Sequence, residues 1–109
     1  MPNGLDFEVR VYAAMAAALM TYEDELEVEG ALNWRDAIEE RLHAGETPSP
    51  ETSHLLAEAD AALIRASEVL VRRFPDLFHP QRKANIPRQN WWWHLDEGSQ
   101  VRKHPEQVA

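Results

Sequence analysis

Cysteine is absent from the 109-residue sequence. Its absence excludes disulfides, thiolate metal sites and cysteine nucleophiles together, and it fits a reducing compartment. Glycine is scarce, with four scattered residues, so there is no glycine-rich loop to cradle a phosphate. The serine and threonine hydroxyls fall in expected turns, caps and helix faces, without the glycine-framed elbow of a nucleophilic serine. We therefore expect a protein that is not an enzyme and binds no cofactor.

Long apolar runs are also missing. The longest run covers ten residues, Val11 to Met20, and half of them are alanine. A helix that crosses a membrane needs about 20 apolar residues. The N-terminus carries no basic segment before an apolar stretch, so no secretory signal is predicted. These absences predict a soluble, cytoplasmic protein without a membrane partner.

Basic residues are outnumbered, and the two signs of charge are unevenly distributed. The formal net charge is −8; residues 1–60 carry fourteen acids and three bases, whereas residues 61–109 carry five acids and eight bases. An acidic body repels phosphate groups, so nucleic-acid binding is not expected. The asymmetry predicts that the basic part lies against the acidic part, in the same chain or in a second copy. The alternative is that the acids cover solvated helix faces.

Apolar residues at helical spacing predict three helices, over residues 6–29, 34–44 and 50–73. Ser49 and Pro50 are a typical N-cap and first helical residue for the third helix. The other expected boundary residues are Asp6, Gly30, Asn33, Gly45 and Pro75. A long–short–long arrangement joined by tight turns is an antiparallel bundle. The predicted fold class is therefore all-α, with a three-helix bundle over residues 1–74.

The middle of the first predicted helix is apolar on nearly every side. Its residues form three neighbouring stripes: Leu5, Tyr12, Met15, Leu19, Tyr22 and Leu26; Phe7, Val11, Ala14 and Ala18; and Val9, Ala13, Ala16 and Met20. Such a helix is central in a bundle or buried at a subunit interface. Because three helices and a thin tail leave part of it uncovered, we expect a homodimer or a subunit of a larger assembly.

The chain changes character after residue 74. Four of its seven prolines follow: Pro75, Pro80, Pro87 and Pro105. Residues 75–98 are predicted to be a proline-rich extension that packs on the bundle or on a partner, and residues 99–109 to be disordered. Within the extension, residues 79–89 are expected to be extended. Asn90 is expected to cap a short tryptophan-rich helical turn over residues 91–97.

Three consecutive tryptophans, Trp91, Trp92 and Trp93, are the most unusual feature of the sequence. Successive helical residues point about 100° apart, so the three indoles cannot pack against one flat surface. In one interpretation the turn folds over the bundle, with two indoles in the core and one at its edge. In the others an indole anchors a partner chain, or stacks on a ligand. His94, beside them, is expected at the surface.

The function predicted from these features is a non-enzymatic protein–protein interaction module, either an adaptor or an assembly subunit. It would use the apolar first helix and the tryptophan-bearing segment. The residues expected to contact a protein partner or a second copy are Trp91, Trp92, Trp93, Leu95, Phe78, Arg82, Lys83 and Arg88. Bases interleaved with aromatics also occur in proteins that bind single-stranded nucleic acid. Three bases on an acidic chain are too few to favour that function.

Two other functions stay open. The first is an acidic inhibitor of a basic target, antitoxin- or immunity-like, whose binding surface is Glu23, Asp24, Glu25, Glu27 and Glu29. The second is a metal-binding helical protein. Its candidate ligands are two Glu-x-x-His pairs, Glu40 with His43 and Glu51 with His54. Both pairs lie on polar helix faces, and the first helix has no acid between residues 9 and 22, so the sequence favours this function less than the other two.

Overall fold

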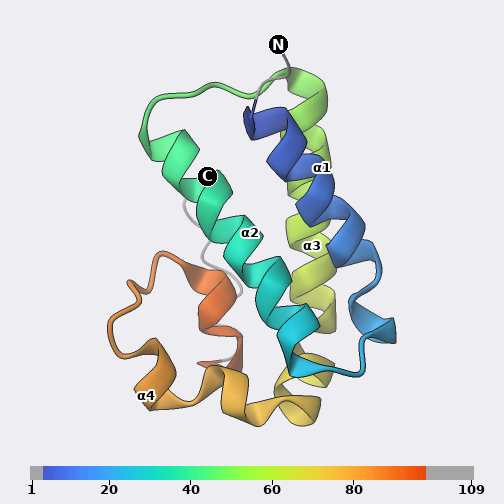
Figure 1. Ribbon diagram of the computed structural model, residues 1–109, viewed down its shortest axis with the longest axis vertical. Helices are drawn as coiled ribbons and strands as arrows, with labels where there is room; N and C mark the ends of the chain where they lie inside the picture. Colours follow the sequence, from blue (N-terminus) through green and yellow to red (C-terminus); the bar gives the residue numbers. More distant parts are fainter. Residues whose placement is uncertain (1–3, 98–109) are drawn as a thin grey trace.

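The structure is a computed structural model, and it describes residues 4–97. Three helices, α1 (Gly4–Ala17), α2 (Glu25–His43) and α3 (Pro50–Arg73), form an antiparallel bundle (Figure 1). The remaining elements are short: η1 (Leu19–Thr21), η2 (Pro75–Phe78), α4 (Pro80–Lys83), η3 (Trp91–Trp93) and η4 (Leu95–Glu97). No strand occurs in this part of the chain. The predicted all-α class, the three-helix bundle and the tryptophan-bearing turn are confirmed.

The boundary between the first two helices differs from the prediction. We expected one helix over residues 6–29 and a short one over residues 34–44, but α1 ends at Ala17 and α2 begins at Glu25. The Asp24 side chain caps α2 by accepting a hydrogen bond from the Leu26 backbone N–H (2.8 Å). Gly30, expected to end a helix, lies inside α2. The three helices therefore have 14, 19 and 24 residues, not a long–short–long pattern.

Gly30 has a packing role instead of a terminating one. A Cβ at this position would lie 3.3 Å from the terminal methyl of Met15 on α1. The glycine therefore allows α1 and α2 to approach closely. Asn33, the expected cap of the second helix, lies exposed within α2.

The predicted ends of α2 and α3 agree with the structure. Gly45 follows α2 with a φ of 96°, a conformation that L side chains rarely adopt, so glycine suits this turn. The Ser49 side chain caps α3 and accepts a hydrogen bond from the Thr52 backbone N–H (3.1 Å), while Pro50 is the first helical residue. The helix ends before Pro75, as expected.

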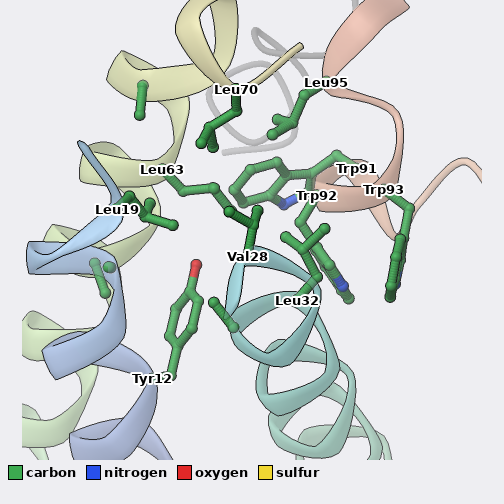
Figure 2. Close-up of a cluster of buried hydrophobic side chains, with 14 of the residues drawn as sticks. Tyr12, Leu19, Val28, Leu32, Leu63, Leu70, Trp91, Trp92, Trp93 and Leu95 are labelled. Atoms are coloured by element: carbon green, nitrogen blue, oxygen red, sulfur yellow. The ribbon is translucent and has the colours of Figure 1, made fainter. Parts of the chain in front are cut away.

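The segment from residue 75 to residue 97, called the C-terminal segment below, completes the core. The bundle contributes Leu5, Val9, Tyr12, Leu19, Val28, Leu32, Ile38, Leu63 and Leu70, and the C-terminal segment contributes Leu77, Phe78, Trp91, Trp92, Trp93 and Leu95. Figure 2 shows the Trp91 and Trp92 indoles among Leu32, Leu63 and Leu70, with the Trp93 indole on the outer side of Trp92. The segment is thus part of the same hydrophobic core as the helices.

The prediction of an extended chain over residues 79–89 is wrong. The His79 side chain accepts a hydrogen bond from the Gln81 backbone N–H (3.1 Å), and Pro80 follows it as the first residue of α4. This cap starts one helical turn, and further turns continue to Asn90. Asn90 makes no side-chain cap, and two 3-10 turns follow it. The disorder expected for residues 99–109 concerns residues outside the described range.

Candidate functional site

All three indoles of the tryptophan triplet are buried. Trp91, Trp92 and Trp93 retain 5%, 1% and 7% of their exposure, so the expectation of one indole at the edge is wrong. The indoles still point in different directions, as the turn geometry requires. The rings of Trp91 and Trp92 meet edge to face, with centroids 5.6 Å apart and planes at 85°.

A single carboxylate on α2 explains how two of the indoles can be buried side by side. Trp92 Nε1 donates to Asp36 Oδ1 (2.7 Å), and Trp93 Nε1 donates to both Asp36 oxygens (2.8 and 3.1 Å). A buried indole N–H without an acceptor costs about 1–3 kcal/mol. Asp36 removes this cost for both rings. It also fixes the C-terminal segment against α2.

Arg35 is a buried charged side chain of α2. It is 6% exposed, and its Nε and Nη2 donate to the two oxygens of Asp60 on α3 (3.0 and 3.2 Å). Its Nη1 donates to Glu39 (2.9 Å), and its guanidinium lies 4.3 Å from the ring centroid of Trp92. Arg35 therefore joins α2, α3 and the C-terminal segment through a bidentate ion pair and a cation–π contact.

Tyr12 extends this network to α1, because its hydroxyl donates to Asp60 Oδ1 (2.7 Å). Burial raises the pKa of Tyr12 far above its ordinary value, and the neighbouring Asp60 charge adds to the effect. Burial acts to lower the pKa of Arg35, but the attraction of Asp60 outweighs it and raises that pKa. The phenol is therefore held as a neutral donor and the guanidinium as a cation. This arrangement suits packing rather than proton transfer.

An open hollow lies on the surface beside Asp36. It has a volume of about 490 Å³ and is lined by Asp36, Glu39, Glu40, His43, Pro87, Gln89 and Asn90. Two of its three carboxylates already bind the core, Asp36 through the indoles and Glu39 through Arg35. Most of the carboxylates that line the hollow therefore already have partners in the buried network of Asp36 and Arg35.

The two Glu-x-x-His pairs do not come together as a metal site. His43 is 3.4 Å from Glu39, and His54 is 3.6 Å from Glu58, with both imidazoles largely exposed. Glu40 and Glu51, the glutamates of the motifs, are exposed as well. Among residues 4–97 no group of three or more potential ligands is placed to hold a metal ion.

The eight residues expected at a partner surface all make contacts within the chain. Trp91, Trp92, Trp93, Leu95 and Phe78 are at most 7% exposed, so a partner could reach them only if the C-terminal segment left the bundle. Arg82 donates to Glu25 and Glu29 of α2, at 2.8 Å each. The prediction that the basic part lies against the acidic part holds for Arg82, within one chain, whereas Lys83 and Arg88 pair with acids of the C-terminal segment itself. Because Glu25 and Glu29 are paired with Arg82, fewer acids of the expected acidic surface remain free.

A second ionic cluster fastens the end of the C-terminal segment. Lys83 donates to Asp96 and Glu97, and Arg88 pairs with Glu97. His94, expected at the surface, is 4% exposed; its Nδ1 lies 2.7 Å from Glu97 and its Nε2 3.1 Å from the Ile86 carbonyl oxygen. The spacing of His94 and Glu97 was the only sequence signal of this contact. The cluster therefore links α4 and the loop after it to η4, within the C-terminal segment.

Acid is expected to weaken this cluster. Burial acts to raise the pKa of Glu97, but hydrogen bonds with His94 and Lys83 outweigh it and lower the pKa below its ordinary value of 4.5. A carboxyl whose pKa is lower in the folded state stabilises the fold above its unfolded pKa and loses this effect as the pH falls through the folded one. Glu97→Gln is therefore expected to reduce the melting temperature near neutral pH and to lessen its fall below about pH 4.5.

Thermal melts at several pH values check this expectation. Glu68→Gln, at an exposed position on α3, is the matched control and should behave like the wild type. An acid response of Glu97→Gln identical to that of the wild type would contradict the role assigned to Glu97.

Large apolar side chains remain exposed elsewhere, on α1, η1 and the start of α2. Phe7, Met20 and Leu26 retain 51%, 57% and 69% of their exposure, and the Phe7 ring packs edge-on against Trp34 at 6.0 Å. Met20 also borders an apolar hollow of about 430 Å³ between α1 and α3, lined by Ala16, Ala17, Leu19, Met20, Ala62, Arg65 and Ala66. Among residues 4–97, the large apolar side chains that meet solvent therefore lie on these elements and not in the tryptophan triplet.

Comparisons with protein-family models, curated proteins and solved structures found no match to the chain. Within residues 4–97, no helix is both long and apolar enough to span a bilayer.

Proposed function

We propose that the protein is a non-enzymatic protein–protein interaction module whose contact surface is formed by η1, the start of α2 and the hollow between α1 and α3. The observation that carries the proposal is the exposure of Met20, which lines that hollow, and of Leu26 at the start of α2. Figure 1 places η1 and the start of α2 at the same end of the bundle. Exposed apolar groups that border an apolar hollow are typical of protein contact surfaces.

In this proposal the C-terminal segment has a supporting role. It supplies three indoles to the core and fixes α2 through Asp36 and Arg35. Arg82 reaches the first turns of α2, where it binds Glu25 and Glu29. These contacts hold the start of α2 in place, and a rigid surface loses less conformational entropy on binding.

The acidic-inhibitor alternative is supported only by the acids that keep their exposure near Leu26, namely Glu23, Asp24 and Glu27. Binding through those acids alone would weaken strongly with salt, whereas binding mainly through Met20 and Leu26 would weaken much less. Salt dependence therefore separates the two functions in one measurement.

Removal of the exposed apolar groups is expected to weaken complex formation strongly. The tagged full chain is incubated with an extract of its source cells, and stoichiometric partners are quantified by mass spectrometry at low and high salt. Met20→Gln combined with Leu26→Gln should reduce the captured partner about tenfold or more, a loss of about 1.4 kcal/mol or more of binding free energy. Such a reduction at both salt concentrations supports the proposal.

The matched control is Ala57→Gln, which adds the same polar group at an exposed position on α3. It should capture as much partner as the wild type, and circular dichroism should show all variants folded. Equal capture by the double variant and the control, or the lack of any stoichiometric partner, would refute the proposal.

A further inference from the structure

We infer that this surface binds a second copy of the chain, with Leu26 of one copy entering the hollow between α1 and α3 of the other and Arg65 pairing with Glu23 and Glu27 across the contact. The inference rests on the proposed function and names its partner. It follows from two complementary features that the same chain carries at separate places.

The first feature is the hollow. Its walls are mainly small or apolar, formed by Ala16, Ala17, Leu19, Met20, Ala62 and Ala66. Arg65 is the one charged residue that lines it. The Arg65 side chain is exposed and forms no ion pair with any residue from 4 to 97. The hollow therefore offers an apolar space with a positive charge at its rim.

The second feature is the start of α2. Leu26 is 69% exposed in the first turn of the helix, with Glu23 and Glu27 exposed on either side of it in the chain. Neither acid forms an ion pair within the described range, whereas Glu25 and Glu29 are occupied by Arg82. This part of the molecule is therefore an apolar tip surrounded by negative charge.

The two features match in chemistry but do not meet within one chain, because Leu26 is exposed and is not among the residues that line the hollow. A second copy can supply the tip to the hollow and receive the first copy's tip in return. Such a two-fold contact is made twice, and this reciprocity is the common basis of homodimers. The charges favour the same pairing, since Arg65 meets acids that lack a partner within the described residues.

The experiment measures self-association of the full chain by sedimentation over a wide range of protein concentration. The wild type is expected to dimerise. Leu26→Gln and Arg65→Glu should each weaken dimerisation about tenfold or more. Arg65→Glu combined with Glu23→Arg and Glu27→Arg should restore it, because the charges are exchanged across the contact. Arg72→Glu makes the same charge change on α3 outside the hollow and should leave dimerisation unchanged.

A wild type that stays monomeric throughout overturns the inference, as does an Arg65→Glu variant that dimerises like Arg72→Glu. A charge-exchanged variant that does not regain dimerisation, although circular dichroism shows it folded, also overturns the inference. These failures are distinct from failure of the proposed function. A monomeric chain whose capture of another protein still depends on Met20 and Leu26 would leave the proposed function standing and remove only the second copy as its partner.

Discussion

Substitution of Trp92 by alanine is expected to lower the free energy of unfolding by about 3–5 kcal/mol. The indole is 1% exposed, stacks under the Arg35 guanidinium at 4.3 Å and donates to Asp36 at 2.7 Å. Its removal leaves a cavity between α2 and the C-terminal segment, and it takes away the apolar cover of a buried charge. The total stability of a small domain is about 5–15 kcal/mol, so a substantial fraction of it would be lost. Urea denaturation followed by circular dichroism measures the change.

Two other substitutions show whether the stability lost in Trp92→Ala comes from the packing of Trp92 in the core. Trp92→Phe keeps a ring beneath Arg35 but removes the donor to Asp36, so its cost should be clearly smaller. Trp34→Ala removes an indole that is only partly buried, at the contact with Phe7. If Trp92→Ala lowered the free energy of unfolding no more than Trp34→Ala, the C-terminal segment would not be a cooperative part of the core. Its residues would then again be candidates for a partner surface.

The parts of the fold that could be predicted from the sequence are those set by neighbouring residues. Ser49 followed by Pro50, and Gly45 at a positive φ, mark helix boundaries by local backbone chemistry. The break between α1 and α2 could not be found in this way, because the apolar spacing continues through Tyr22 and Leu26. Asp24, its true cap, stands among other acids and gives no distinct signal.

The polar contacts of the core depend on residues far apart in the chain. The direction of the three indoles could be inferred from turn geometry, but their complete burial depends on Asp36, more than fifty positions earlier. Arg35 did leave a signal, because it shares the spacing of Val28, Ala31 and Ile38 on the buried side of α2. A lone charge on an apolar stripe indicates a buried ion pair, although only the fold identifies Asp60 as its partner.

Substitution of Asp60 by alanine is expected to destabilise the fold by about 3–5 kcal/mol, because it leaves a buried charge without its main partner. Arg35 would lose its two hydrogen bonds to Asp60 and keep only Glu39. The Tyr12 hydroxyl would lose its acceptor at the same time. Urea denaturation measures the effect, and Tyr12→Phe, which removes one neutral donor, should cost only about 0.5–1.5 kcal/mol.

The double variant Arg35→Met with Asp60→Leu tests whether the ion pair itself stabilises the protein. Replacing both charges of a buried pair by apolar groups is often neutral, whereas removing one partner is not. The double variant should therefore be more stable than Asp60→Ala alone, although Tyr12 still lacks its acceptor. Adding Tyr12→Phe should recover part of the remaining loss. If the double variant were as unstable as Asp60→Ala, the cost would lie in the geometry that Arg35 imposes on Trp92 and α3 rather than in an unpaired charge.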